Sequence, residues 1–176
     1  DMYASTVVLE VDKGSIDMLS IHNNTFNSQG TGDVLVGLDL SGIGTYYQVS
    51  TLSMYDNEFD QGGAAAASRF AKLKNVKNAS IRSNQISGSG AMTAVVDVTA
   101  SNVSLSDNYA TSLAGPFLDI ADQTSNFFIG PNELNVDSTR AYVSSTAIVK
   151  TLTWGAQVKI KGNELNPSAN SVIVIP

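Results

Sequence analysis

The chain has 176 residues, no cysteine, only 15% charged residues and a formal net charge of −6 at pH 7. This length predicts one domain over residues 1–176, and the absence of cysteine excludes a disulfide scaffold, thiol catalysis and a cysteine-based zinc site. The acidic balance without basic clusters argues against a nucleic-acid partner. No apolar run reaches the ~18 residues of a membrane span. The chain has no metal or cofactor motif, so we expect neither group.

Short strand-like segments follow one another along the chain, separated by Gly, Asn, Asp and Ser residues that favour turns. In chain order they are 5–11 (STVVLEV), 19–24 (LSIHNN), 34–40 (VLVGLDL), 52–57 (LSMYDN), 63–74 (GAAAASRFAKLK), 79–84 (ASIRSN), 94–98 (AVVDV), 103–108 (VSLSDN), 117–121 (FLDIA), 127–132 (FFIGPN), 142–149 (YVSSTAIV), 158–163 (VKIKGN) and 172–175 (VIVI). Segment 63–74 is the best helix candidate, but its place in the series favours a strand in at least its second half. About three short strands per 24 residues is the content of one turn of a parallel β-helix.

Six of these segments are versions of one phrase, in which two apolar residues alternate with polar ones and an asparagine closes the phrase. The closing asparagines are Asn24, Asn57, Asn84, Asn108, Asn132 and Asn163, at spacings of 33, 27, 24, 24 and 31 residues. A second row lies six residues upstream, at Asn78, Asn102 and Asn126. Such internal repeats indicate a solenoid. Stacked strands bring equivalent residues to about 4.8 Å, where asparagine amides can hydrogen-bond to one another as a ladder. Asparagine also tolerates left-handed backbone, which suits a corner between sheets.

The phrase LSIHNNTF, with its relatives ASIRSNQI and VSLSDN, resembles the right-handed parallel β-helix superfamily, which includes pectate lyases, polygalacturonases and phage tailspikes. The resemblance extends from Ser15 to Ile175. It implies an all-β, right-handed, single-stranded parallel β-helix of about six coils with asparagine ladders. Neither end carries a polar cap of the kind that solenoids need. We therefore expect a fragment or processed part of a longer chain, most similar to a phage tailspike or surface-fibre segment.

The longer repeats predict two insertions, 41–47 (SGIGTYY) and 151–155 (TLTWG), along one edge of the solenoid. Tyr46, Tyr47 and Trp154 would project there. Loops on a rigid scaffold commonly carry binding residues, and aromatic rings bury large apolar area at low entropic cost. The edge is therefore a candidate for sugar contact. Folding back onto the core or packing against another subunit remains an alternative for the same aromatic residues.

The outward positions of the asparagine-ended strands form another candidate surface. One row there contains His22, Tyr55 and Arg82, and neither outward row contains a carboxylate. Arg82 flanked by Tyr55 is suited to an acidic sugar, although a solvated surface arginine is the alternative. His22 is the only histidine, and an imidazole without a defined partner is weak evidence for catalysis.

Two carboxylate pairs near the asparagines are the candidates for a catalytic site. Asp56 and Asp107 precede ladder asparagines two repeats apart, at roughly 9–10 Å, near the spacing of an inverting glycosidase. Glu133 and Glu164 follow ladder asparagines in adjacent repeats, at about 5 Å, which suits a retaining one. Neither pair carries the surrounding motifs of the resembled hydrolases, and acidic residues are common at turns.

These observations favour a non-catalytic structural or adhesive segment of a surface or virion fibre, extracellular or on the virion surface. It would form a homotrimer or join flanking domains, with a cell-surface polysaccharide as ligand. Polysaccharide cleavage, by a glycoside hydrolase or polysaccharide lyase or a fragment of one, is the first alternative. A pure assembly module is the second.

Overall fold

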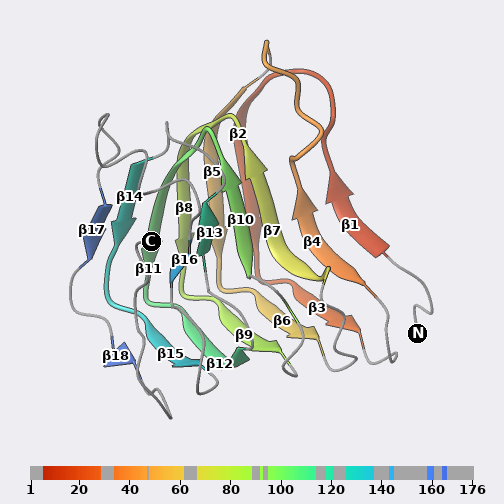
Figure 1. Cartoon of the computed structure of the whole chain (residues 1–176). Helices are drawn as coiled ribbons and strands as arrows, with labels where there is room; N and C mark the ends of the chain where they lie inside the picture. Colours follow the sequence, from red (N-terminus) through yellow and green to blue (C-terminus); the bar gives the residue numbers. More distant parts are fainter. Residues whose placement is uncertain are drawn as a thin grey trace.

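A computed structural model describes residues 6–28, 34–46, 48–61, 67–88, 92, 95–113, 118–120, 126–136, 143–144, 158–160 and 164–165. Within these ranges the regular elements are strands and there is no helix (Figure 1). The strands are arranged as three six-stranded sheets, and every pairing within each sheet is parallel. The strands confirm the all-β expectation for the described residues, and their parallel pairing confirms the predicted parallel arrangement.

Each sheet takes every third strand of the chain. Sheet A contains β1 (Thr6–Glu10), β4 (Leu35–Asp39), β7 (Arg69–Lys74), β10 (Val96–Thr99), β13 (Leu118–Ile120) and β16 (Val143–Ser144). Sheet B contains β2 (Ile16–His22), β5 (Val49–Tyr55), β8 (Val76–Arg82), β11 (Asn102–Ser106), β14 (Asn126–Ile129) and β17 (Val158–Ile160). Sheet C contains β3 (Thr25–Ser28), β6 (Glu58–Gln61), β9 (Gln85–Gly88), β12 (Tyr109–Leu113), β15 (Glu133–Val136) and β18 (Glu164–Leu165).

The chain therefore visits sheets A, B and C in turn and then returns to A, one strand further along. Figure 1 shows this as a colour gradient across each sheet, from the red β1 and β2 to the blue β17. This cyclic order is compatible with a parallel β-helix. The second half of 63–74 is a strand, β7, as its place in the series predicted.

Apolar residues from all three sheets meet in the interior because side chains alternate along each strand. In sheet B the inward pairs Leu52–Met54, Ile81–Ala79 and Leu105–Val103 are buried and lie in register. Three phenylalanines from β3, β6 and β7 add an aromatic cluster, with ring centroids 5.7 to 6.5 Å apart: Phe26, Phe59 and Phe70. Centroid distances in this range are favourable for tilted and edge-on rings.

The corner between sheets B and C is a two-residue turn that ends in the ladder asparagine. The first residue of the turn has left-handed backbone at Asn23, Asp56, Ser83 and Asp107, with φ of 54° to 56°. The asparagine itself is outside the left-handed region at these turns, so the expectation that the ladder residue supplies that geometry was wrong. Asn and Asp are enriched among left-handed residues, which accounts for three of the four positions. At the next turn the equivalent residue is Pro131, whose ring holds φ near −65°.

The asparagine ladder is continuous over the five turns that the structure describes. Each Nδ2 donates to Oδ1 of the next asparagine, at 3.1 Å (Asn24 to Asn57), 3.0 Å (Asn57 to Asn84), 3.0 Å (Asn84 to Asn108) and 2.8 Å (Asn108 to Asn132). The same oxygens accept the backbone N–H of the preceding asparagine at 3.1 to 3.2 Å. Asn163 lies outside the described residues.

The upstream row is bonded differently. Asn102 Nδ2 donates to the backbone carbonyl of Lys77 at 2.8 Å, and Asn78 Nδ2 lies 3.5 Å from the carbonyl of Ser50. Asn126 is the register partner of Asn102, but its side chain lies outside the described part. These amides therefore join neighbouring repeats through the backbone.

Candidate functional site

The outer face of sheet B carries two rows that run across the strands. The first, which we call the stacked row, consists of His22, Tyr55, Arg82 and Ser106. The second, the serine row, contains Ser20, Ser53, Ser80, Ser104 and Phe128. It continues to Lys159 on β17, whose side chain lies outside the described part. Parallel in-register pairing places the members of each row about 4.8 Å apart and the two rows roughly 6.6 Å apart.

Three side chains of the stacked row are in direct contact. The rings of His22 and Tyr55 are stacked with centroids 4.7 Å apart and an interplanar angle of 11°. The guanidinium carbon of Arg82 lies 4.5 Å from the Tyr55 ring centroid, over the ring. Asn23 Nδ2 lies 3.1 Å from His22 Nδ1 and holds the outer end of the stack. Because β2 and β8 flank β5, the two neighbours approach the tyrosine ring from opposite sides.

This stack changes the role expected of Tyr55. Both faces of its ring are used within the protein, so they are closed to a sugar ring. The tyrosine instead orients Arg82 by a cation–π contact, which is worth about 0.5–1 kcal/mol at an exposed site. The pairing of Tyr55 with Arg82, predicted from sequence, is present, and Arg82 is the exposed member of the pair.

Phe128 is a second exposed aromatic group on the same face, and the sequence-based reasoning did not select it as a binding residue. Its side chain is 44% exposed. A Cβ added to Gly130 would lie 3.0 Å from Phe128 Cε1 and 3.3 Å from Ser106 Cβ, so the missing side chain of Gly130 makes room for the ring. The signal lay in FFIGPN, where an aromatic residue replaces the outward serine and glycine occupies the following outward position.

The other predicted binding residues lie elsewhere or outside the described part. Tyr46 is 96% exposed in the loop that precedes β5. Tyr55 ends β5, six residues after Val49, so Tyr46 is roughly 20 Å or more from the stacked row. Tyr47 and Trp154 lie outside the described residues. Tyr46 and the Tyr55–Arg82 pair therefore cannot serve one sugar ring.

The structure describes the side chains of one of the two predicted carboxylate pairs, Asp56 and Asp107. Asp56 and Asp107 are exposed at the left-handed turn positions, with Ser83 in the turn between them. Glu133 and Glu164 are register partners in β15 and β18, as their positions predicted, but their side chains are outside the described part. Among the described residues no cluster of three or more His, Cys, Asp or Glu side chains is suited to a metal ion.

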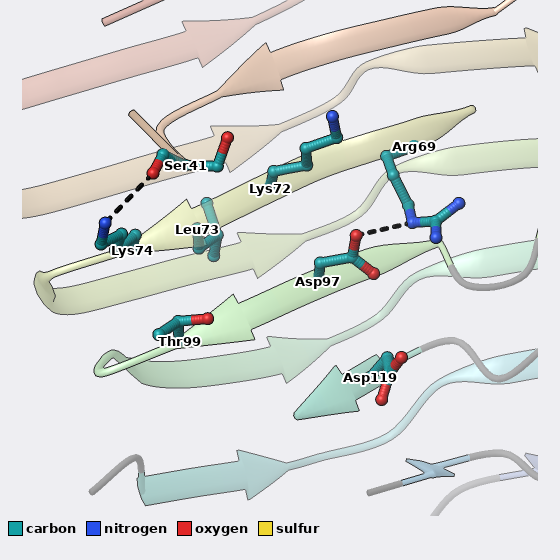
Figure 2. A pocket seen from close by; sticks show the side chains of 8 residues that line it. All are labelled: Ser41, Arg69, Lys72, Leu73, Lys74, Asp97, Thr99 and Asp119. Carbon is teal, nitrogen blue, oxygen red and sulfur yellow. Dashed lines mark hydrogen bonds and ion pairs between the residues drawn. The ribbon is translucent and has the colours of Figure 1, made fainter. Parts of the chain in front are cut away.

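A charged groove on the outer face of sheet A is a feature that the sequence-based reasoning missed (Figure 2). It is an open depression of about 430 Å³ lined by Ser41, Arg69, Lys72, Leu73, Lys74, Asp97, Thr99 and Asp119. Arg69 Nε contacts Asp97 Oδ2 at 2.8 Å, and Lys74 Nζ donates to the Ser41 carbonyl at 3.3 Å. The signal was a second repeated phrase, apolar–charged–apolar, at 9–11 (LEV), 38–40 (LDL), 71–73 (AKL), 96–98 (VDV) and 118–120 (LDI).

Asp39 lies beside this groove and is held as a carboxylate. Its burial alone would raise its pKa, but hydrogen bonds from Ser41 Oγ and N, and the hydrogen bond and charge of Lys72, outweigh burial and lower the pKa below its ordinary value of 3.8. Lys72 Nζ contacts Asp39 Oδ2 at 3.1 Å. Lys72 and Arg69 thus each have a carboxylate partner on sheet A.

Of the described residues, none belongs to a helix long and apolar enough to cross a membrane. Comparison with protein-family models, curated proteins and solved structures gives no match for this chain.

Proposed function

We propose that this chain is a non-catalytic, adhesive segment of a surface or virion fibre, built as a right-handed parallel β-helix of about six coils. In this proposal three copies assemble as a homotrimer at the cell or virion surface, and the outer face of sheet B contacts a polysaccharide. The asparagine ladder supports the structural part, because buried amides paired from repeat to repeat suit a stiff rod.

The single observation that carries the adhesive part is the stack of His22, Tyr55 and Arg82. A surface arginine normally samples many rotamers, and holding one costs side-chain entropy. In this protein the Tyr55 ring already restricts the Arg82 guanidinium, so part of that side-chain entropy is lost before a ligand binds. Preorganised polar groups bind with a smaller entropic penalty. The serine row beside the stack supplies hydroxyl groups that can pair with sugar hydroxyls.

A glycan-binding experiment tests this proposal. Purified protein is titrated with oligosaccharides from bacterial and animal cell surfaces, using calorimetry and saturation-transfer NMR. We expect binding that falls about tenfold or more in Arg82→Ala, because hydrogen bonds to a charged group are worth ~1.5–3 kcal/mol. The matched control is Arg69→Ala, which removes an arginine of sheet A and should leave binding unchanged. Equal loss in both variants, or no binding by the wild type, would overturn the adhesive part.

The charged groove favours a second candidate, polysaccharide cleavage. Asp97 and Asp119 are register partners on β10 and β13, so their backbones lie about 4.8 Å apart. Retaining glycosidases hold their two carboxyl groups ~5–5.5 Å apart, a separation that side chains projecting in parallel from this backbone spacing would approach. Release of reducing ends by the wild type, abolished in Asp97→Asn, would favour this candidate over the first.

A further inference from the structure

We propose that the ligand of sheet B is an acidic glycan, with a sugar carboxylate bound by Arg82 and a neutral sugar of the same chain stacked on Phe128. The glycan then lies obliquely across β8, β11 and β14, from the stacked row to the serine row. This inference rests on the proposed glycan contact and adds to it the charge, the orientation and the two anchor residues.

The distribution of charge over the molecule is the first support. The protein has a net charge of −6, yet neither the stacked row nor the serine row contains a carboxylate. The acidic groups Asp39, Asp97 and Asp119 project from sheet A instead. A chain that is acidic overall thus presents one outer face whose rows hold a cation and uncharged groups. This arrangement suits an anionic ligand.

The bonding state of Arg82 is the second support. The described ion pairs join Arg69 to Asp97 and Lys72 to Asp39, whereas Arg82 rests on an aromatic ring. Its planar N–H groups are therefore available to a carboxylate. Guanidinium and carboxylate groups form two parallel hydrogen bonds, which makes arginine the preferred partner for this anion. The stack on Tyr55 fixes the plane in which those donors lie.

The distance between the two anchors is the third support. Arg82 and Phe128 are separated by two strand spacings and one row, which is roughly 12 Å between Cα atoms. Ser104 and Ser106 lie on β11 between them. Small side chains leave space there for a sugar ring and offer hydroxyl groups to it. A short oligosaccharide thus has an anionic end, a hydroxyl-rich middle and a ring that covers Phe128.

The turn residues define the direction from which the anion arrives. Asp56 and Asp107 each follow a stacked-row position by one residue and are exposed at the corner. A sugar carboxylate that approached across this corner would be repelled by them. We therefore expect it to approach from the serine row, and Asp107→Asn should tighten binding of the acidic glycan.

The test uses matched pairs of ligands. Hyaluronan tetrasaccharide and sialyllactose are each compared with the same oligosaccharide after reduction of its carboxyl group, by calorimetry at two salt concentrations. We expect the wild type to bind at least one acidic form about tenfold more tightly than its reduced partner, with a preference that shrinks as salt rises. Arg82→Gln should abolish the preference, and Phe128→Ala should weaken both forms equally. Arg69→Gln is the matched control and should change neither.

The outcomes separate this inference from the proposed function. Equal binding of acidic and reduced forms by the wild type overturns the acidic ligand while the glycan contact stands. No binding of either form overturns both. A preference that survives Arg82→Gln assigns the carboxylate to another residue and overturns the proposed site. Thermal unfolding of each variant checks that loss of binding does not reflect loss of the fold.

Discussion

Replacing Asn108 by leucine tests whether the amide ladder stabilises the fold. Asn108 is 1% exposed. Its Oδ1 accepts Asn84 N at 3.1 Å and Asn84 Nδ2 at 3.0 Å, and its Nδ2 donates to the Ile81 carbonyl at 2.9 Å and to Asn132 Oδ1 at 2.8 Å. Leucine has a similar size but offers neither donor nor acceptor. The substitution therefore removes four hydrogen bonds in the interior at once.

The expected cost depends on which partners stay unpaired. Asn84 Nδ2 keeps the carbonyls of Met54 and Arg82, and Asn132 Oδ1 keeps the Asn108 backbone N–H. The Asn84 N–H and the Ile81 carbonyl each lose a ladder partner. An unsatisfied buried group costs about 1–3 kcal/mol. Two such groups, offset by the added apolar burial of leucine, predict a loss of roughly 2–4 kcal/mol in the free energy of unfolding.

Urea unfolding followed by far-UV circular dichroism measures this loss, with Asn24→Leu as the matched control. Asn24 ends the described ladder and is exposed, so water replaces its lost bonds and we expect a cost under about 1 kcal/mol. The denaturant slope should be the same in both variants, since a change in slope would indicate a different native or denatured state. Equal costs for Asn108→Leu and Asn24→Leu would refute the argument that buried amide pairing stabilises the stack.

Three further predictions concern the surface and the assembly. The pKa of Asp39 is below 3.8 in the folded state, so its carboxylate stabilises the fold above that pH and the contribution is lost as pH falls below it. The difference in urea midpoint between wild type and Asp39→Asn should therefore be present at neutral pH and shrink in strong acid. A difference that does not change with pH would contradict the role of Ser41 and Lys72. Light scattering should give three times the 18.5 kDa chain mass. If Trp154→Ala keeps this mass but binds glycan more weakly, the edge predicted to carry Trp154 contacts the ligand. If Trp154→Ala is monomeric and still binds glycan, that edge joins the subunits of the trimer. Incubation of the protein with capsule, O-chain or pectin should release no reducing ends or unsaturated products. A release that disappears in Asp97→Asn, Asp56→Asn or Glu133→Gln would instead show that the protein cleaves polysaccharide.

The strands and the ladder were predictable because they depend on residues that recur in register. Alternation of period two located the inward pairs, and the closing asparagines marked one corner in every repeat. At that corner each ladder side chain meets the equivalent asparagines of the neighbouring repeats, so one spacing rule at about 4.8 Å predicts the ladder. The same rule predicted that Tyr55 and Arg82 would be neighbours.

Other features depend on contacts that a repeat pattern does not specify. The sequence places Tyr55 between His22 and Arg82 but does not show that both faces of its ring are covered. The assignment of left-handed geometry to the asparagine was wrong because Asn and Asp share that tendency, and the preceding residue was the one in the left-handed region. The charged groove was not predicted because the apolar–charged–apolar phrase in sheet A is a weaker repeat than the asparagine phrase.

The ladder also explains how single substitutions in the repeats change the outer surface of this fold. Because the amide pairs hold successive repeats at one strand spacing, every outward position is fixed relative to its equivalents, whatever residue stands there. Serine at four positions of the serine row gives an uncharged surface, and on β14 Phe128, with Gly130 beside it, adds an exposed aromatic ring. In the stacked row, the contacts among His22, Tyr55 and Arg82 add a supported cation to the outer surface. Arg82 and Phe128 lie two strands and one row apart, so a ligand that contacted both would run obliquely across β8, β11 and β14.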